Sequence, residues 1–201
     1  MTKVKICGIT RAEDAQLASE LGADFLGFIF VRTSPRYIEP EKAAEIAASV
    51  KGPKYVGVFR DESVDTIHRI THRAGLDLIQ FHGTESDEDM HTLGMPGVKA
   101  IRVGETLPDT SSYPSAEWLL FDTFDDRRDG GTGRRFDWSL LAMYSRNKPF
   151  FLAGGLAPDN VAAAISLVRP DAIDVSSGVE SEPGVKDPDK LRNLFERVRR
   201  T

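Results

Sequence analysis

Residues 3–30, KVKICGITRAEDAQLASELGADFLGFIF, hold the pattern that decides the fold. Two short apolar segments, 3–9 and 24–30, enclose a stretch in which apolar residues recur every three or four positions. The first pattern is typical of a buried strand and the second of an amphipathic helix. A strand, a helix and a second strand in this order predict a βαβ unit, which is the building block of a parallel sheet.

Helix boundaries support this interpretation. Thr10 and Glu13 stand at the spacing of a capping box, and Gly22 can end the same helix in the left-handed conformation. Proline fits the first position of a helix, where its missing N–H would be unpaired in any case. Three prolines are predicted to occupy such positions, namely Pro40, Pro158 and Pro188.

Apolar segments of strand length occur eight times along the 201 residues. They are 3–9, 24–30, 54–59, 77–81, 98–103, 117–121, 150–153 and 171–175. Helical patterns fill the gaps, and the weakest covers 105–115, where the helix is expected to be short or absent. An open, doubly wound sheet is the alternative, but it usually has fewer strands. The count therefore predicts a single-domain (β/α)₈ barrel over residues 1–201, at the short end for that fold.

Composition excludes several classes of protein. The net charge is −5, without the basic excess of a nucleic-acid surface. No segment approaches the roughly 20 apolar residues of a membrane helix, and the start of the chain lacks the apolar core of a signal peptide. A single cysteine cannot form an internal disulfide or a multi-cysteine metal site. We expect a cytoplasmic protein without a resident metal, and we expect His68 and His72 to lie on the surface.

Polar residues gather where the predicted strands end. In a parallel barrel the carboxyl ends of all strands meet at one rim, which carries the active site. These rim residues are Cys7, Arg36, His82, Asp122, Gly154, Gly155, Ser176, Ser177 and Gly178.

Cys7 allows two interpretations. A free cysteine is usually a small buried apolar residue, but a thiol becomes a useful base where a positive charge lowers its pKa. Lys5 lies two residues earlier and so shares the inward face of the strand. Its ammonium group needs a partner inside the barrel, for which Asp174 is the candidate. The Lys5–Asp174 pair is either structural or part of the substrate site, and the sequence leaves both open.

Asp122 ends an apolar segment, so it either caps a loop or has a chemical role. The residues that follow it, 122–135, read DTFDDRRDGGTGRR. A long loop with glycines over a barrel mouth is predicted to act as a lid or to form an irregular surface loop.

The glycines and serines after the last two strands indicate an anion site. Barrel phosphate sites are commonly built from the loops after strands seven and eight and a short extra helix, which residues 176–178 can open. Arg36 can hold a carboxylate in a bidentate fork if it faces the cavity. His82 is expected to donate a hydrogen bond or line the site, although a core histidine is equally consistent with the sequence.

At these residues the sequence resembles the phosphoribosylanthranilate isomerase family. The matching stretches include KICGIT (5–10), SPRYI (34–38), QFHG (80–83), GGTGRRFDW (130–138), AGGL (153–156) and DVSSGVE (174–180). The resemblance implies a cofactor-free (β/α)₈ barrel that catalyses an Amadori rearrangement in tryptophan biosynthesis. It implies that Asp122 is the general acid and Cys7 the general base. It also implies that Arg36 meets the anthranilate carboxylate, while the glycine and serine loops bind the phosphate.

Two other functions remain open at this point. A related isomerase acting on a histidine-pathway aminoaldose would usually carry two opposed aspartates, whereas the first strand here ends in Cys7. A non-catalytic barrel that binds phosphorylated sugars would need the phosphate loops but not Cys7 together with Asp122. The oligomeric state cannot be read from the sequence.

Overall fold

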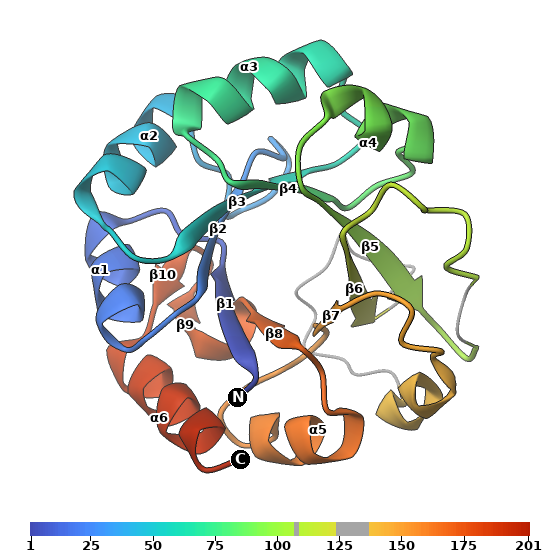
Figure 1. The fold of residues 1–201 in the computed structure, drawn as a ribbon. Coiled ribbons are helices and arrows are strands. Elements are labelled where there is room, and N and C mark those ends of the chain that lie inside the picture. The colour runs from blue at the N-terminus through green and yellow to red at the C-terminus, as the bar shows by residue number, and fades with distance from the viewer. Residues whose placement is uncertain (107–108, 124–136) are drawn as a thin grey trace.

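The computed structural model describes residues 1–106, 109–123 and 137–201, and eight parallel strands form a closed barrel in the order β1 to β8 (Figure 1). The strands are β1 (Lys3–Cys7), β2 (Phe25–Ile29), β3 (Lys54–Phe59), β4 (Leu78–Phe81), β5 (Gly97–Val103), β6 (Trp118–Thr123), β7 (Phe150–Leu152) and β8 (Ala172–Val175). All eight predicted strands are confirmed, each within two residues of its predicted limits. The predicted (β/α)₈ architecture is therefore correct.

Helices surround the barrel as an outer ring (Figure 1). They are α1 (Ala12–Glu20), α2 (Pro40–Ser49), α3 (Val64–Ala74), α4 (Asp87–Leu93), α5 (Val161–Val168) and α6 (Pro188–Arg199), with the 3₁₀ helices η1 (Trp138–Met143) and η2 (Ser177–Val179). A short hairpin of β9 (Glu180–Glu182) and β10 (Val185–Lys186) follows η2. The described residues between β5 and β6 contain no helix, as the composition of 105–115 predicted.

Two of the predicted helix starts are wrong. The Thr10 hydroxyl does not cap α1, because it donates instead to the Gly184 carbonyl of the β9–β10 turn, 2.5 Å away. Pro158 lies in a turn before α5 rather than at its first position. The Asn160 side chain closes that turn, since it accepts from the Ala157 N–H and donates to the Gly155 carbonyl.

Other boundaries follow the prediction. Pro40 and Pro188 are the first residues of α2 and α6. Gly22 follows α1 with a φ of +96°, in the left-handed region that favours glycine. None of the helices described here is long and apolar enough to cross a membrane.

The barrel interior is filled from its amino-terminal end by apolar side chains. Phe25 packs edge to face against Phe151, with ring centroids 5.3 Å apart, and Trp118 lies over the same ring. Side chains alternate along each strand, so Lys5 and Cys7 point inward above this apolar layer. The same alternation directs Asp122 inward, two residues after the buried Leu120. The carboxyl end of the barrel is therefore the polar end.

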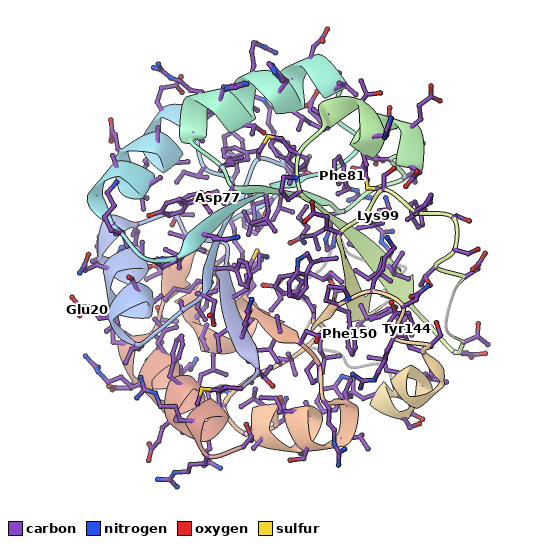
Figure 2. The ribbon with its side chains drawn as sticks, viewed as in Figure 1. Glu20, Asp77, Phe81, Lys99, Tyr144 and Phe150 are labelled. Carbon is purple, nitrogen blue, oxygen red and sulfur yellow. The ribbon has the colours of Figure 1, made fainter. Side chains whose placement is uncertain are left out.

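The larger apolar core lies between the strands and the helices. Around β6, β7 and η1 it contains a cluster of aromatic rings, in which Phe121, Tyr144 and Phe150 pack edge to face with centroids 5.1 to 5.5 Å apart. Figure 2 shows Tyr144 and Phe150 side by side there. This packing supports the strand ends that carry the site.

Candidate active site

A cavity of about 530 Å³ opens at the carboxyl ends of the strands. Nine of the ten residues predicted for the site line it: Cys7, Arg36, His82, Asp122, Gly154, Gly155, Asp174, Ser176 and Ser177. The tenth, Gly178, lies in η2 behind the cavity, where an added Cβ would be 2.0 Å from the Leu156 carbonyl oxygen. Gly178 thus permits close packing of η2 against the loop after β7.

Cys7 is the last residue of β1 and is buried. Gly27 on the neighbouring strand leaves room for it, since a Cβ there would lie 2.8 Å from the Cys7 sulfur. Burial raises the pKa of the Cys7 thiol, while the positive charge of Lys5 opposes that rise. Cys7 is therefore a thiol with a cation close by.

Lys5 forms the predicted pair with Asp174. Its ammonium group is buried and donates to Asp174 Oδ2 and to Gln80 Oε1, each 2.9 Å away. Burial alone lowers the pKa of Lys5, but the negative charge of Asp174 and that of an ionised Cys7 outweigh it and raise the pKa. Lys5 therefore remains a fixed positive charge beside Cys7.

Asp122 lies across the cavity, next to the end of β6. Its Oδ1 accepts a hydrogen bond of 2.8 Å from the Thr123 N–H, and its Oδ2 is 3.6 Å from His82 Nε2. Burial raises the pKa of Asp122, and the Thr123 hydrogen bond and the charge of Arg102 oppose the rise. The carboxyl group consequently holds its proton to a higher pH than an exposed aspartate does.

His82 faces the same cavity from the end of β4 and makes a contact of 3.1 Å between its Nδ1 and Gln80 Nε2. Burial, with help from the charges of Arg102 and Lys5, lowers the pKa of His82 to about 4. The ring is therefore neutral near pH 7 and carries one N–H donor.

The loops after β7 and β8 form the rim of the cavity between the ends of β6 and β1. Gly154 and Gly155 have φ values of +85° and +67°, and a Cβ at Gly154 would lie 2.3 Å from Thr123 Oγ1. The hydroxyl oxygen of Ser176 is buried and has no hydrogen-bond partner among the described residues. Ser177 begins η2, so its N–H lies at a helix N-terminus that faces the cavity.

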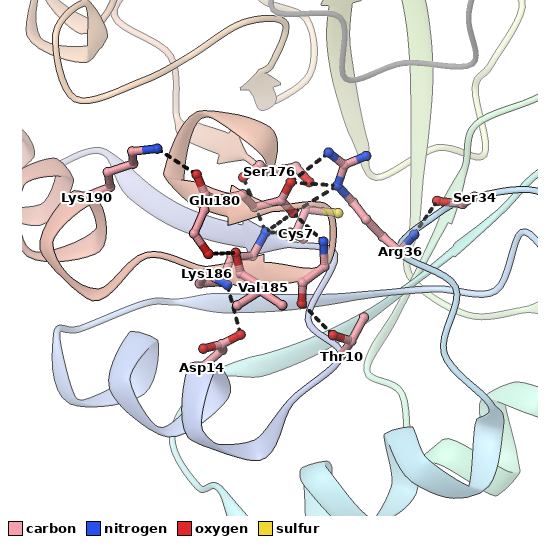
Figure 3. Close-up of polar contacts among 12 residues, drawn as sticks. Cys7, Thr10, Asp14, Ser34, Arg36, Ser176, Glu180, Val185, Lys186 and Lys190 are labelled. Atoms are coloured by element: carbon pink, nitrogen blue, oxygen red, sulfur yellow. Dashed lines mark hydrogen bonds and ion pairs between the residues drawn. The ribbon is translucent and has the colours of Figure 1, made fainter.

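Arg36 reaches the cavity from the loop after β2, and the protein's own Glu180 holds it. Nε donates to both carboxylate oxygens at 2.9 and 3.1 Å, and Nη2 donates to Oε2 at 2.7 Å (Figure 3). Gly8 makes room for this side chain, because a Cβ there would lie 2.8 Å from Arg36 Cδ. The guanidinium is therefore pre-oriented, with N–H groups left over.

Lys186 was not predicted. Its buried ammonium group donates to the Cys7 carbonyl oxygen (2.6 Å), to Glu180 Oε1 (2.8 Å) and to the Ser176 carbonyl oxygen (3.3 Å) (Figure 3). Burial lowers the pKa of Lys186, opposed by the charge of Glu180. Burial acts to raise the pKa of Glu180, but Arg36 and Lys186 together outweigh it and lower the pKa. The Lys186 ammonium group thus ties the end of β1 to the loop after β8.

Sequence reasoning also missed Gln80 and Arg102, both of which line the cavity. Arg102 stands opposite Asp122 in the β5–β6 register. Each missed residue follows an inward-facing apolar residue by two positions, Leu78 on β4 and Ala100 on β5, so strand alternation could have identified both as inward-facing.

The predicted lid within 122–135 lies, from residue 124 onward, outside the described residues. In the part of the chain that the structure describes, no three His, Cys, Asp or Glu side chains are grouped as metal ligands.

The barrel and the polar cavity at the carboxyl ends of its strands define a (β/α)₈-barrel enzyme that acts on a small molecule. The family model of N-(5'phosphoribosyl)anthranilate (PRA) isomerase matches residues 4–197, and the chain belongs to this family.

Individual relatives agree with this membership. The N-(5'-phosphoribosyl)anthranilate isomerase of Citrifermentans bemidjiense is 47% identical, over 97% of this chain and 96% of that protein. The crystal structure of phosphoribosyl anthranilate isomerase from Thermotoga maritima is 38% identical, covers all of both chains and superposes with a TM-score of 0.92. A structure of phosphoribosyl anthranilate isomerase with reduced 1-(o-carboxyphenylamino)-1-deoxyribulose 5-phosphate is 36% identical, also over both whole chains, with a TM-score of 0.87.

Proposed function

We propose that this protein converts N-(5-phosphoribosyl)anthranilate into 1-(2-carboxyphenylamino)-1-deoxyribulose 5-phosphate, an Amadori rearrangement in tryptophan biosynthesis. The observation that carries the proposal is the placement of Cys7 on β1 and Asp122 on β6 around one cavity, with the rim of Gly154 and Ser176 between them. Family membership supports it, as does the related isomerase crystallised with a reduced form of that product.

Asp122 starts the reaction as the general acid. It gives its proton to the ribose ring oxygen, the bond between that oxygen and C1 breaks, and the nitrogen lone pair forms a protonated imine with C1. The raised pKa of Asp122 supports this role, because a buried carboxyl group still holds a proton where an exposed one has lost it.

Cys7 completes the rearrangement as the general base. Its thiolate takes the proton from C2, the released electron pair forms a C1–C2 double bond, and the imine π electrons return to nitrogen. The resulting enolamine tautomerises to the ketone. Lys5 supports the thiolate by its charge. Every step is a proton transfer with bond rearrangement, so the proposal includes no cofactor.

The remaining residues of the cavity bind the two anionic ends of the substrate. We assign the phosphate to the loops of Gly154, Gly155, Ser176 and Ser177, with Gly178 supporting η2 from behind. Arg36 binds the anthranilate carboxylate through the N–H groups that Glu180 leaves over. His82 and Asp174 line the space between. Binding energy from these ends can hold the sugar at the acid and the base.

Three further features belong to the proposal. Residues 1–201 form one catalytic domain, which the family match over 4–197 supports. The partner is a phosphorylated small molecule and neither nucleic acid nor a membrane, in keeping with the net charge of −5. The enzyme acts in the cytoplasm, where a cysteine base stays reduced.

The test is an activity assay with substrate made in situ from anthranilate and phosphoribosyl pyrophosphate by a transferase. Enzyme-dependent loss of anthranilate-type fluorescence, without added metal or nucleotide, is the expected result. A well-folded sample that causes no loss would contradict the proposal. The same sample would then be assayed with the histidine-pathway aminoaldose, and a barrel that only binds phosphorylated sugars would be the remaining alternative.

A further inference from the structure

A line of polar side chains crosses the barrel interior from β8 to Asp122. Asp174 Oδ2 and Gln80 Oε1 each accept from Lys5 Nζ at 2.9 Å. Gln80 Nε2 is 3.1 Å from His82 Nδ1, and His82 Nε2 is 3.6 Å from Asp122 Oδ2. Gln80 and Lys5 are almost fully buried, so water cannot readily replace these contacts.

The chemistry of each group determines which atom donates and which accepts at each contact in this series. An ammonium group can only donate, so the side-chain oxygen of Gln80 must face Lys5. The amide nitrogen of Gln80 then faces His82, and an amide nitrogen also only donates. His82 Nδ1 must therefore be the unprotonated, accepting nitrogen. The single proton of a neutral ring then lies on Nε2, the atom that faces Asp122.

We propose that Gln80 is a positioning residue, which holds His82 in the Nε2–H tautomer so that His82 presents a hydrogen-bond donor to Asp122. The donor matters after Asp122 has given its proton away, because the new carboxylate then gains an N–H partner in a buried site. The proposal rests on the proposed function for the role of Asp122. The orientation of the ring rests on the contacts alone.

The neutral state of His82 supports this role. Burial and the charges of Arg102 and Lys5 lower its pKa to about 4. A protonated ring would present donors at both nitrogens, and one of them would meet the amide nitrogen of Gln80 without an acceptor. The Lys5–Gln80 contact thus favours a neutral ring with one defined tautomer.

The tautomer can be measured by long-range ¹H–¹⁵N NMR on the full chain labelled with ¹⁵N-histidine. The sequence has four histidines, and the exposed His68, His72 and His91 serve as internal references. For His82 we expect an unprotonated Nδ1 and a protonated Nε2 at neutral pH. A protonated Nδ1 in the wild-type protein would overturn the proposal.

Two variants change the donor. Gln80→Met removes it, and we expect His82 to become a mixture of tautomers. Gln80→Glu replaces it with an acceptor, and we expect a proton on Nδ1. If Gln80→Met does not fold, Gln80→Glu carries the same test, because Lys5 keeps a partner there. A ring that is unchanged in the folded variants would contradict the role of Gln80.

Steady-state kinetics distinguishes a positioning role of Gln80 from a purely structural one. We expect Gln80→Met to lower kcat on the order of tenfold with little change in KM. A glutamine at position 82 can place an amide N–H near the Nε2 position without help from residue 80. Gln80→Met should therefore lower kcat much less in the His82→Gln variant than in the wild-type protein. An equal loss of kcat in both backgrounds would overturn the proposal. The NMR result needs no turnover, so its failure is distinct from a failure of the proposed function.

Discussion

The two sides of the barrel mouth hold their reactive groups differently. On the β1–β8 side, Cys7 lies close to two buried ammonium groups, those of Lys5 and Lys186. Each cation is paired with a carboxylate within 2.9 Å, Asp174 in the first case and Glu180 in the second. Cys7 is therefore set in a network of fixed charges.

On the β4–β6 side, Asp122 has fewer fixed partners. It contacts the Thr123 N–H and the ring of His82, and the exposed Arg102 is the cation that lowers its pKa most. About one-fifth of the Asp122 side chain is open to the cavity. Burial raises the pKa of both Asp122 and Cys7. At Cys7 the buried cations Lys5 and Lys186 oppose that rise, whereas at Asp122 the Thr123 hydrogen bond and the charge of Arg102 oppose it more than Lys5 does. The difference suits a base that must become an anion and an acid that must remain neutral.

The largest expected effect comes from removing either reactive group. Cys7→Ala and Asp122→Asn should each lower kcat by about 10² to 10⁴, because a positioned proton-transfer group contributes that much. Steady-state kinetics with circular dichroism as a folding check measures this. The matched control is Asp159→Asn, an exposed carboxylate after β7, which should leave turnover unchanged. Near-normal turnover in Cys7→Ala or Asp122→Asn would overturn the assignment of that residue.

The next largest effect is on the free energy of unfolding, which should depend on which side of the barrel mouth loses a cation. Lys5→Met leaves Asp174 buried without its cation and should lower the free energy of unfolding by about 3 to 5 kcal/mol, measured by urea denaturation. Adding Asp174→Asn should recover part of the loss. On the other side, Arg102→Met removes an exposed cation and should cost far less. Equal losses in Lys5→Met and Arg102→Met would remove the contrast between the two sides.

A smaller effect, on KM, is expected from changes to Arg36 and its partner Glu180. Arg36→Ala should raise KM by roughly 10- to 100-fold, the value of a lost charge-assisted contact. Glu180→Gln should raise KM less, since it loosens Arg36 without removing it. Arg32→Ala in the same loop is the control, because Arg32 packs over the Tyr37 ring and does not line the cavity. An unchanged KM in Arg36→Ala would place Arg36 outside substrate binding.

The smallest effect has opposite signs for binding and stability. Ser176 buries a hydroxyl without a partner among the described residues, so Ser176→Ala should stabilise the fold by about 1 kcal/mol. The same change should raise KM several-fold if the hydroxyl binds the substrate phosphate. Thermal unfolding and kinetics on one sample measure both. A KM that does not change would remove Ser176 from the phosphate site.

The architecture could be predicted because its signals are local. Strand patterns and the residues at strand ends identified the eight strands and nine of the residues around the cavity. The pairing of Lys5 with Asp174 also followed, since the inward face of β1 and the adjacency of β8 require it.

Pairing that does not follow from the strand register could not be predicted in the same way. Glu180 and Lys186 lie in a short hairpin whose contacts with Arg36 and Cys7 join positions 144 and 179 residues apart. Thr10 satisfies every local rule for a helix cap, yet it bonds to Gly184 instead. The Gly184 carbonyl, which is distant in sequence, outweighed the local preference of Thr10 to cap a helix. The residues around Thr10 do not indicate that this acceptor is present.

The central claim is that Cys7 is the base and Asp122 the acid. The reactive form then combines a Cys7 thiolate with a protonated Asp122. Because the ordinary pKa of an aspartate lies far below that of a cysteine, and both are raised here, this form is a minor fraction. Its population is constant between the two pKa values. It falls below the pKa of Asp122, where Cys7 stays protonated, and above the pKa of Cys7, where Asp122 has lost its proton.

The most direct test is the pH dependence of kcat/KM in the wild-type enzyme and in Asp122→Asn. The wild type should show a plateau that breaks downward at an acid pH above the ordinary pKa of aspartate. In Asp122→Asn that break should disappear, and the residual rate should climb steadily with pH until Cys7 is ionised. An acid break at the same pH in both proteins would contradict the account, because it would belong to a group other than Asp122.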